Sequence, residues 1–238
     1  TSDSLEGRET GRPGQKKAAN YIANYFEKIG IPPSVTKKNR YTKRTETSYF
    51  QKFRVKSNRH LCKCDDCDVD FIKDLLGVKR WIEGENVLGY IEGSDLKEEL
   101  LVITSHYDHL GKHDTLIFPG ADDNGSGTAA TLEIAEAFML AKMDGNGPRR
   151  SVLIMPVSGE EKGLLGSKYY TKKPVFPLEN TITNLNIDMI GRIDDWHKDG
   201  NYVYLIGSDM LSQELHDISE DVNKKYTNLE LDYTFNQE

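Results

Sequence analysis

Hydrophobic and polar positions alternate with two different periods along this chain, and the first clear pattern is helical. Between residues 13 and 30, apolar side chains recur every three or four positions, and Pro-Gly precedes the segment while Gly-Ile-Pro-Pro closes it. The apolar positions are Ala18, Tyr21, Ile22, Tyr25, Phe26 and Ile29. This spacing predicts an amphipathic surface helix whose aromatic stripe packs against a core.

Later segments alternate between short apolar runs and helical patterns. We expect strands at 86–93, 100–108, 151–159, 180–191 and 202–207, and helices at 126–142 and 209–226. The first two strands are expected to be joined by a polar turn. Strands that alternate with helices predict an α/β protein, here a three-layer α/β/α sandwich around a mostly parallel mixed sheet. The length of 238 residues suits a single domain over residues 1–238.

Residues 34–80 fit this alternation least well. A basic stretch, KKNRYTKRTET, precedes SYFQKFRV, whose alternation is typical of an edge strand, and CKCDDCD follows. We expect an insertion or an edge hairpin rather than a second domain. Cys62, Cys64 and Cys67 lack the paired spacing of a structural zinc site, so a local disulfide or free thiols are favoured over a metal.

Composition narrows the classes of partner. Hydrophobic residues make up 37% of the chain and charged residues 29%, which is enough for a packed core. A net charge of -7 argues against a nucleic-acid surface, which needs clustered Lys and Arg. No apolar run reaches the roughly 20 residues of a membrane span. The chain starts without Met and without a leader, and we expect a processed protein with an extracytoplasmic location, either periplasmic or secreted. No pattern indicates the oligomeric state.

Two adjacent acids, Glu160 and Glu161, follow the apolar run in VLIMPVSGEEKGLLGS. A Glu-Glu pair usually lies on a solvated helix face. Here the pair comes directly after a strand that is predicted to be buried on both sides, and parallel sheets place their chemistry just beyond the carboxyl ends of such strands.

Three further segments place ionisable groups at strand ends or helix starts. ITSHYDHLG supplies His106 and Asp108, PGADDNGSG supplies Asp122 and Asp123, and LNIDMIG supplies Asp188. Taken one at a time, His106 fits a packed histidine, Asp123 fits a helix N-cap and Asp188 fits a turn acid. Gathered at one sheet edge, the acids would repel one another unless cations neutralised them. Asp108 lies on the same strand face as His106 and can orient its imidazole, as carboxylates do around zinc histidines.

The order His-x-Asp, Gly-Ala-Asp-Asp-Asn-Gly-Ser-Gly, Gly-Glu-Glu-x-Gly-Leu-Leu-Gly-Ser and Asn-x-Asp-Met-Ile-Gly resembles the co-catalytic zinc aminopeptidases of metallopeptidase family 28, the bacterial leucyl aminopeptidase-like enzymes. The resemblance runs from about residue 4 to 191. It implies zinc-dependent release of N-terminal amino acids from peptides. It also implies that His106, Asp123 and Asp188 bind one zinc, that Asp123 bridges to a second zinc held by Glu161, and that Glu160 is the general base for a metal-bound hydroxide.

The chain departs from this family in one respect. The second zinc of the family takes a histidine from a late segment, and the sequence ends in LDYTFNQE without a match. His197 and His216 have the contexts of surface or packing residues, and His109 and His113 follow the first motif too closely. We therefore expect a chain truncated at its carboxyl end, with one zinc or none bound well and weak turnover.

Three alternatives stay open. The resemblance also includes glutaminyl-peptide cyclisation on the same fold with a single zinc. A non-catalytic binding domain is the second alternative. The third is a carboxypeptidase or dipeptidase. The complete motif set favours hydrolysis of peptides that have a free N-terminus.

Overall fold

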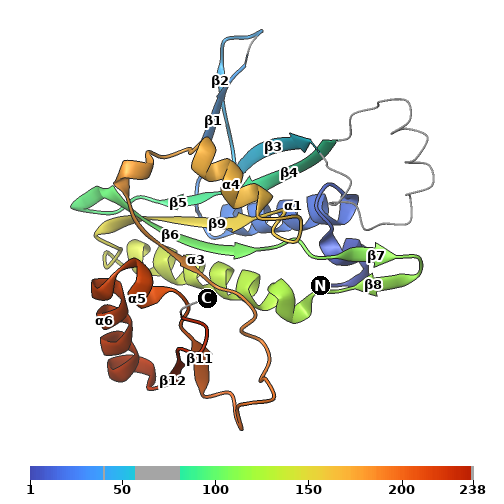
Figure 1. Cartoon of the computed structure of the whole chain (residues 1–238). Coiled ribbons are helices and arrows are strands. Elements are labelled where there is room, and N and C mark those ends of the chain that lie inside the picture. The colour runs from blue at the N-terminus through green and yellow to red at the C-terminus, as the bar shows by residue number, and fades with distance from the viewer. Residues whose placement is uncertain (40, 57–80, 237–238) are drawn as a thin grey trace. The chain divides into compact units, whose positions relative to one another are not determined.

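The computed structural model describes residues 1–39, 41–56 and 81–236, which group into two compact units, Thr1–Met189 and Ile190–Glu238 (Figure 1). Every metal-site residue predicted from the sequence belongs to the first unit. Cys62, Cys64 and Cys67 lie outside the described residues, as does the rest of 57–80. A single catalytic domain over the whole chain remains a prediction.

A four-stranded sheet in the order β10-β6-β9-β5 forms the centre of the first unit. Strand β6 (Leu96–His106) pairs in parallel with both β9 (Arg150–Val157) and β10 (Thr181–Asn186). Strand β5 (Gly89–Ile91) runs antiparallel to β9. The prediction of a mostly parallel mixed sheet is therefore confirmed.

Helices cover both faces of this sheet. Helix α1 (Pro13–Lys28) and helix α3 (Gly127–Met143) pack on one face, and α4 (Leu165–Lys172) packs on the other. Helix α1 begins with proline in its first turn, where the missing N–H is not needed, and is followed by Gly30 at φ +84°. The predicted α/β/α layering is thus present in the first unit.

The apolar run of β9 explains why two helix layers are needed. Val152 and Ile154 belong to the core cluster beneath α1 and α3, whereas Leu153 and Met155 belong to the cluster that includes Tyr170 of α4. Successive side chains of a strand point to opposite faces, so a strand covered on both faces must be apolar at every position.

Short strands outside the central sheet pair as antiparallel hairpins or ribbons. The pairs are β1 (Val35–Lys38) with β2 (Thr45–Ser48), β3 (Phe50–Lys56) with β4 (Trp81–Val87), and β7 (Gly111–His113) with β8 (Leu116–Phe118). The expectation of a strand in SYFQKFRV agrees with β3. Short helical turns are η1 (Asp3–Arg8), η3 (Ala121–Ser126) and η4 (Leu178–Asn180).

The strand expected at 86–93 is divided in the structure. Its first residues end β4, which pairs with β3, and its later residues form β5, which pairs with β9. At the break, the N–H of Leu88 donates to the carbonyl of Tyr49. Strands β5 and β6 are also not neighbours, because β9 lies between them. A turn between consecutive strands does not by itself make them pair.

The second unit contains a parallel pair, β11 (Tyr202–Tyr204) with β12 (Glu230–Asp232). Its helical segments are α5 (Ser208–Leu211), α6 (Gln213–Val222) and η5 (Asn223–Thr227). The single helix expected at 209–226 is broken at Ser212, whose hydroxyl accepts a hydrogen bond from the N–H of Leu215 and so caps α6.

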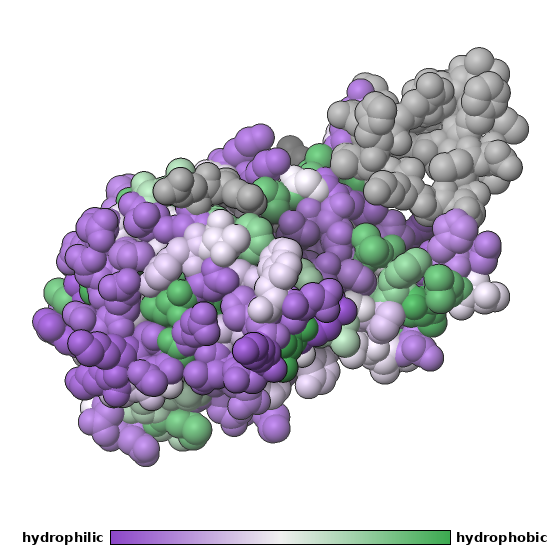
Figure 2. Space-filling view, turned by 60° about the horizontal axis from the view of Figure 1, so that its bottom comes forward, coloured by the Kyte–Doolittle hydropathy of each residue, from purple (hydrophilic) through white to green (hydrophobic). Residues whose placement is uncertain are grey.

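Hydrophilic residues predominate on the face drawn in Figure 2, and hydrophobic residues form smaller separate groups there. Across the residues that the structure describes, no helix combines the length and apolar character needed to cross a membrane.

Candidate metal centre

Strand β6 delivers a buried imidazole at its carboxyl end. His106 is 3% exposed, and its Nδ1 lies 3.1 Å from the backbone oxygen of Asp108 and 3.8 Å from the Oδ1 of the same residue. The carbonyl of Asp108 is thus a closer partner than the carboxylate that the sequence analysis assigned to this role. With its proton on Nδ1, the ring presents Nε2 as a ligand atom.

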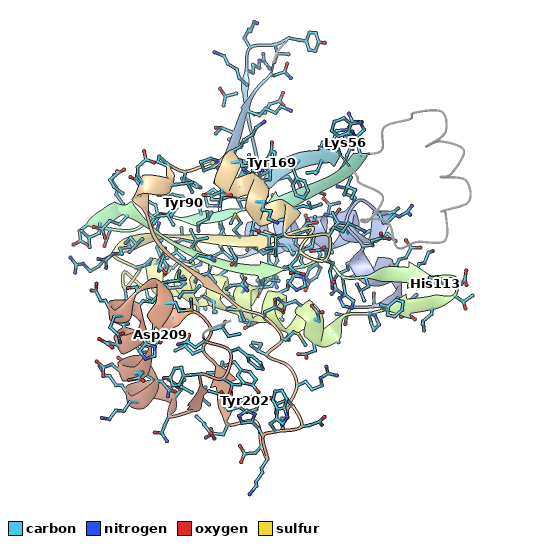
Figure 3. All side chains as sticks on the ribbon, viewed as in Figure 1. Lys56, Tyr90, His113, Tyr169, Tyr202 and Asp209 are labelled. Atoms are coloured by element: carbon cyan, nitrogen blue, oxygen red, sulfur yellow. The ribbon has the colours of Figure 1, made fainter. Side chains whose placement is uncertain are left out.

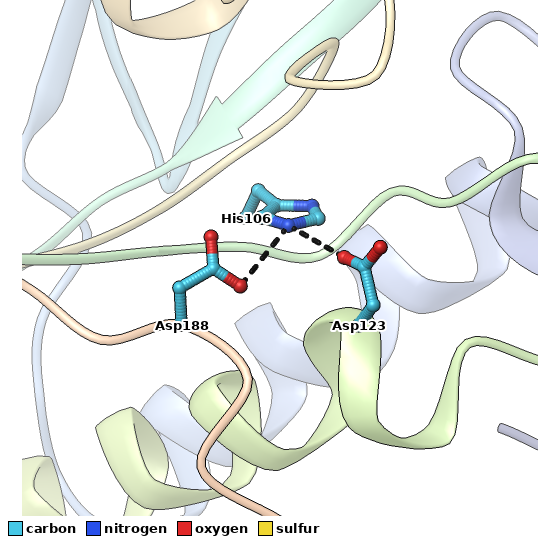
Figure 4. Close-up of side chains that lie close together, drawn as sticks. All are labelled: His106, Asp123 and Asp188. Atoms are coloured by element: carbon cyan, nitrogen blue, oxygen red, sulfur yellow. Dashed lines mark ion pairs between the residues drawn. The ribbon is translucent and has the colours of Figure 1, made fainter. Parts of the chain in front are cut away.

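Nε2 of His106 faces two carboxylates from other elements (Figure 4). It lies 3.0 Å from Oδ1 of Asp123, in η3, and 3.5 Å from Oδ1 of Asp188, which follows β10. The three ligand atoms lie within 4.8 Å of one another. The structure therefore brings together the three residues that the resemblance assigns to one zinc.

A buried amide holds two of these acids in place. The side chain of Asn124 donates to the carbonyl of Ile187, and its oxygen accepts the N–H of Gly127, each at 2.9 Å. This links the turn that carries Asp123 to the segment that carries Asp188. A Cβ on Gly127 would lie 2.3 Å from the Asn124 oxygen, so the close approach requires glycine. The sequence motifs gave no signal for a role of Asn124.

The turn after β9 positions the adjacent glutamates. Gly159 has φ +79°, and the next N–H, that of Glu160, donates to Oδ1 of Asp108 over 3.2 Å. The other carboxylate oxygen of Asp108 accepts the Thr10 hydroxyl at 2.8 Å. Asp108 is fully buried, so its carboxylate fixes the backbone that bears Glu160. The contacts make Asp108 a positioning residue.

A second group of donors adjoins the first. His109 Nδ1 lies 2.7 Å from Oε1 of Glu161 and 3.8 Å from Oδ2 of Asp123. These three ligand atoms also lie within 4.8 Å of one another. His109 was not predicted as a ligand, because it follows His106 so closely in the sequence. In the structure β6 ends at His106, and the chain turns so that His109 faces Glu161.

The electrostatics of the cluster reflect crowded acids. Burial raises the pKa of Glu160, and burial together with the charge of Asp123 raises the pKa of Glu161. Burial alone would lower the pKa of His106, but a hydrogen bond to Asp188 and the neighbouring acids outweigh it and raise this pKa to about 9. A divalent cation would replace the protons that the cluster otherwise holds, and imidazole nitrogens with carboxylate oxygens are ligands that zinc accepts.

Arg8, in η1, binds the loops that carry the site residues. Its guanidinium donates to the carbonyls of Tyr107, Pro119 and Gly120 at 2.6 to 2.9 Å. These carbonyls lie beside the end of β6 and before the turn of Asp123. Nothing in the pattern of the first residues indicated this role, because the partners are about a hundred positions away.

His197 and His216 have partners within the second unit. His197 stacks on Tyr202 with ring centroids 3.5 Å apart, and its Nδ1 lies 2.9 Å from Oδ1 of Asp194. His216 Nδ1 lies 2.8 Å from the hydroxyl of Ser208. These contacts agree with the sequence-based interpretation of both as packing residues.

Residues 86–237, which carry the histidine, aspartate and glutamate motifs of the site, match the sequence profile of Peptidase family M28, and the chain belongs to this family. A probable zinc metalloprotease of Pyrenophora tritici-repentis is 40% identical over 114 residues, which is 44% of this chain and 22% of that protein. Aminopeptidase YwaD of Bacillus subtilis is 31% identical over 116 residues, 48% of this chain and 23% of that protein.

Among solved structures, a zinc aminopeptidase from Bacillus subtilis superposes with a TM-score of 0.63 at 17% identity, covering 97% of this chain and 76% of that one. This likeness concerns the fold. The matched region spans less than a quarter of the length of the two curated relatives.

Proposed function

We propose that the protein is a zinc-dependent peptidase that releases N-terminal amino acids from peptides. The observation that carries this proposal is the convergence of His106, Asp123 and Asp188, from three separate segments, with ligand atoms within 4.8 Å of one another. Membership of Peptidase family M28 supports the same chemistry. In this proposal these three residues would hold one zinc ion, and Asp123 and Glu161 would hold a second.

Glu160 is the general base in the proposed reaction. Bound zinc would supply a Lewis acid and lower the pKa of a water ligand towards ~7. The carboxylate of Glu160 accepts a proton from the attacking water and passes it to the leaving amine. Burial raises the pKa of Glu160, which brings this pKa closer to the pH at which the carboxyl group must both accept and donate a proton. Asp108 keeps Glu160 in position because its carboxylate accepts a hydrogen bond from the backbone N–H of Glu160.

The preference for a free N-terminus is proposed from the relatives alone. An aminopeptidase of known sequence and a zinc aminopeptidase of known structure resemble the chain. An extracytoplasmic location remains part of the prediction.

Replacing Glu160 by Gln tests the assignment. We expect kcat on aminoacyl substrates to fall by about 10² to 10⁴-fold with zinc content unchanged, because only the proton acceptor is lost. Glu133→Gln, an exposed glutamate of α3, is the matched control and should retain full activity. His106→Ala should lose the zinc itself.

Two results would contradict the proposal. Full activity in Glu160→Gln would remove its role as base. Cyclised rather than cleaved product from a peptide with N-terminal Gln would assign the site to cyclotransfer instead of hydrolysis.

A further inference from the structure

We propose that His109 is a ligand of a second zinc ion, which it shares with Asp123 and Glu161. This inference rests on the proposed zinc-dependent function and deepens it. The resemblance assigns Asp123 and Glu161 to this ion, and both lie beside His109 in the structure. A third ligand from the loop after β6 would complete a three-residue site inside the first unit.

The first observation is a pair of buried atoms that face one another without a hydrogen bond. Nδ1 of His109 and Oε1 of Glu161 are 2.7 Å apart, yet within the described residues neither has a hydrogen-bond partner. The contact has the distance of a hydrogen bond but not its geometry. Buried polar atoms are rarely left in this way. A cation contacted by both lone pairs would satisfy both.

The second observation is the orientation of Asp123. Its Oδ1 lies 3.0 Å from Nε2 of His106, and its Oδ2 lies 3.8 Å from Nδ1 of His109. The two oxygens of one carboxylate therefore face two different imidazoles. A carboxylate that bridges two ions presents its oxygens in this way, one towards each ligand set.

The third observation is that packing fixes the His109 ring. The residue is 9% exposed. A Cβ built on Gly120 would lie 2.5 Å from Cγ of His109 and 2.6 Å from its Cδ2, so the ring fills the space that this glycine leaves open. Gly120 has φ +55°, and its carbonyl accepts a hydrogen bond from Arg8. The ring is thus held against a fixed turn with Nδ1 directed at the acids, the pre-organised state that a ligand residue requires.

His113 provides the contrast on the same stretch of chain. It lies at the end of β7 in an exposed hairpin (Figure 3), and its side chain is 53% exposed. Its imidazole lies 3.7 Å from the carboxylate of Asp114, also exposed. Because it is the same residue type four positions further on, His113 is the matched control.

The experiment is a zinc titration of the metal-free full chain by calorimetry and native mass spectrometry. We expect two ions in the parent and in His113→Ala. We expect His109→Ala to keep the first ion and to bind the second at least about 100-fold more weakly, since even residues that only support a ligand contribute 10- to 100-fold. His109→Phe, which keeps a ring in the packed space, should behave like His109→Ala.

Replacing zinc with cobalt identifies the histidine ligands in the unmutated protein by NMR. An imidazole bound through one nitrogen keeps an exchangeable N–H on the other, and each such proton gives one paramagnetically shifted resonance. We expect two, assigned to His106 and His109 by the loss of one in each variant. The number of such resonances in the unmutated protein can be counted even where a variant does not fold.

The outcomes separate this inference from the function it deepens. Two ions bound equally well by the parent and both His109 variants would overturn the role of His109 and leave the peptidase proposal intact. One ion in the parent, lost in His106→Ala, would do the same. No ion in the parent would overturn both.

Discussion

Asn86 offers a direct test of how the scaffold holds the glutamate turn. The residue is fully buried at the end of β4. Its amide donates to Oε1 of Gln51 and to the carbonyl of Gly166, both at 2.9 Å, and its oxygen accepts the N–H of Ser158 at 3.4 Å. One side chain thus ties β3 to both ends of the turn that carries Glu160.

Replacing Asn86 by Ala removes three hydrogen bonds and leaves buried groups of Gln51, Gly166 and Ser158 without this partner. Each net bond contributes about 1 kcal/mol, and a buried polar group left unpaired costs about 1–3 kcal/mol, so we expect a loss of about 3 kcal/mol in the free energy of unfolding. For a chain of this size, that corresponds to a Tm lower by about 6–12 °C.

The assay is urea-induced and thermal unfolding of the metal-free protein, followed by circular dichroism. Asn146→Ala is the control, because Asn146 is exposed and its amide makes one contact of 3.5 Å with the carbonyl of Asp144. It should stay within about 0.5 kcal/mol of the parent. A similarly small effect of Asn86→Ala would show that Asn86 does not fix the turn.

Four further outcomes are expected. Zinc at 100 times its Kd should stabilise the protein by about 2.7 kcal/mol and raise Tm by about 5–10 °C, and chelation should reverse this; an unchanged Tm would contradict a folded-state metal site. Gly127→Ala should lower stability by about 1–3 kcal/mol in urea unfolding, because its Cβ has no room; an unchanged midpoint would refute this. Thr10→Val should cost about 1–3 kcal/mol in the same assay by unpairing a buried carboxylate oxygen of Asp108, and equal stability would contradict it. The hydrogen bond to Asp194 raises the pKa of His197, so its stabilisation is present at low pH and lost as pH rises through the raised pKa; an NMR titration should show this pKa above its ordinary value and a decrease in Asp194→Asn.

Local patterns were sufficient for the layers of the fold, and the motif resemblance singled out three residues that lie close together in the structure. The apolar run of β9 and the apolar spacing of α1 each indicate which of their own side chains are buried. These elements are therefore close to their predicted bounds. The approach of His106 and Asp188 was predictable because the carboxyl ends of the parallel strands β6 and β10 share one edge, whereas Asp123 reaches them from η3.

The rest depends on contacts between distant segments, which leave no periodic signal. The division of 86–93 is set by its pairing with β3 on one side and with β9 on the other. The position of His109 is set by the turn after β6 and by the space above Gly120. A spacing of three residues from His106 looks crowded in sequence, yet the turn sends the two imidazoles to different oxygens of Asp123.

The three carbonyl oxygens that Arg8 binds connect the beginning of the chain to the metal centre. Cleavage just beyond Arg8 would leave every metal ligand in the polypeptide, but Tyr107, Pro119 and Gly120 would lose a shared donor. The amino-terminal segment therefore holds in place loops about a hundred residues away, and we expect its removal to weaken the site although every ligand residue would remain.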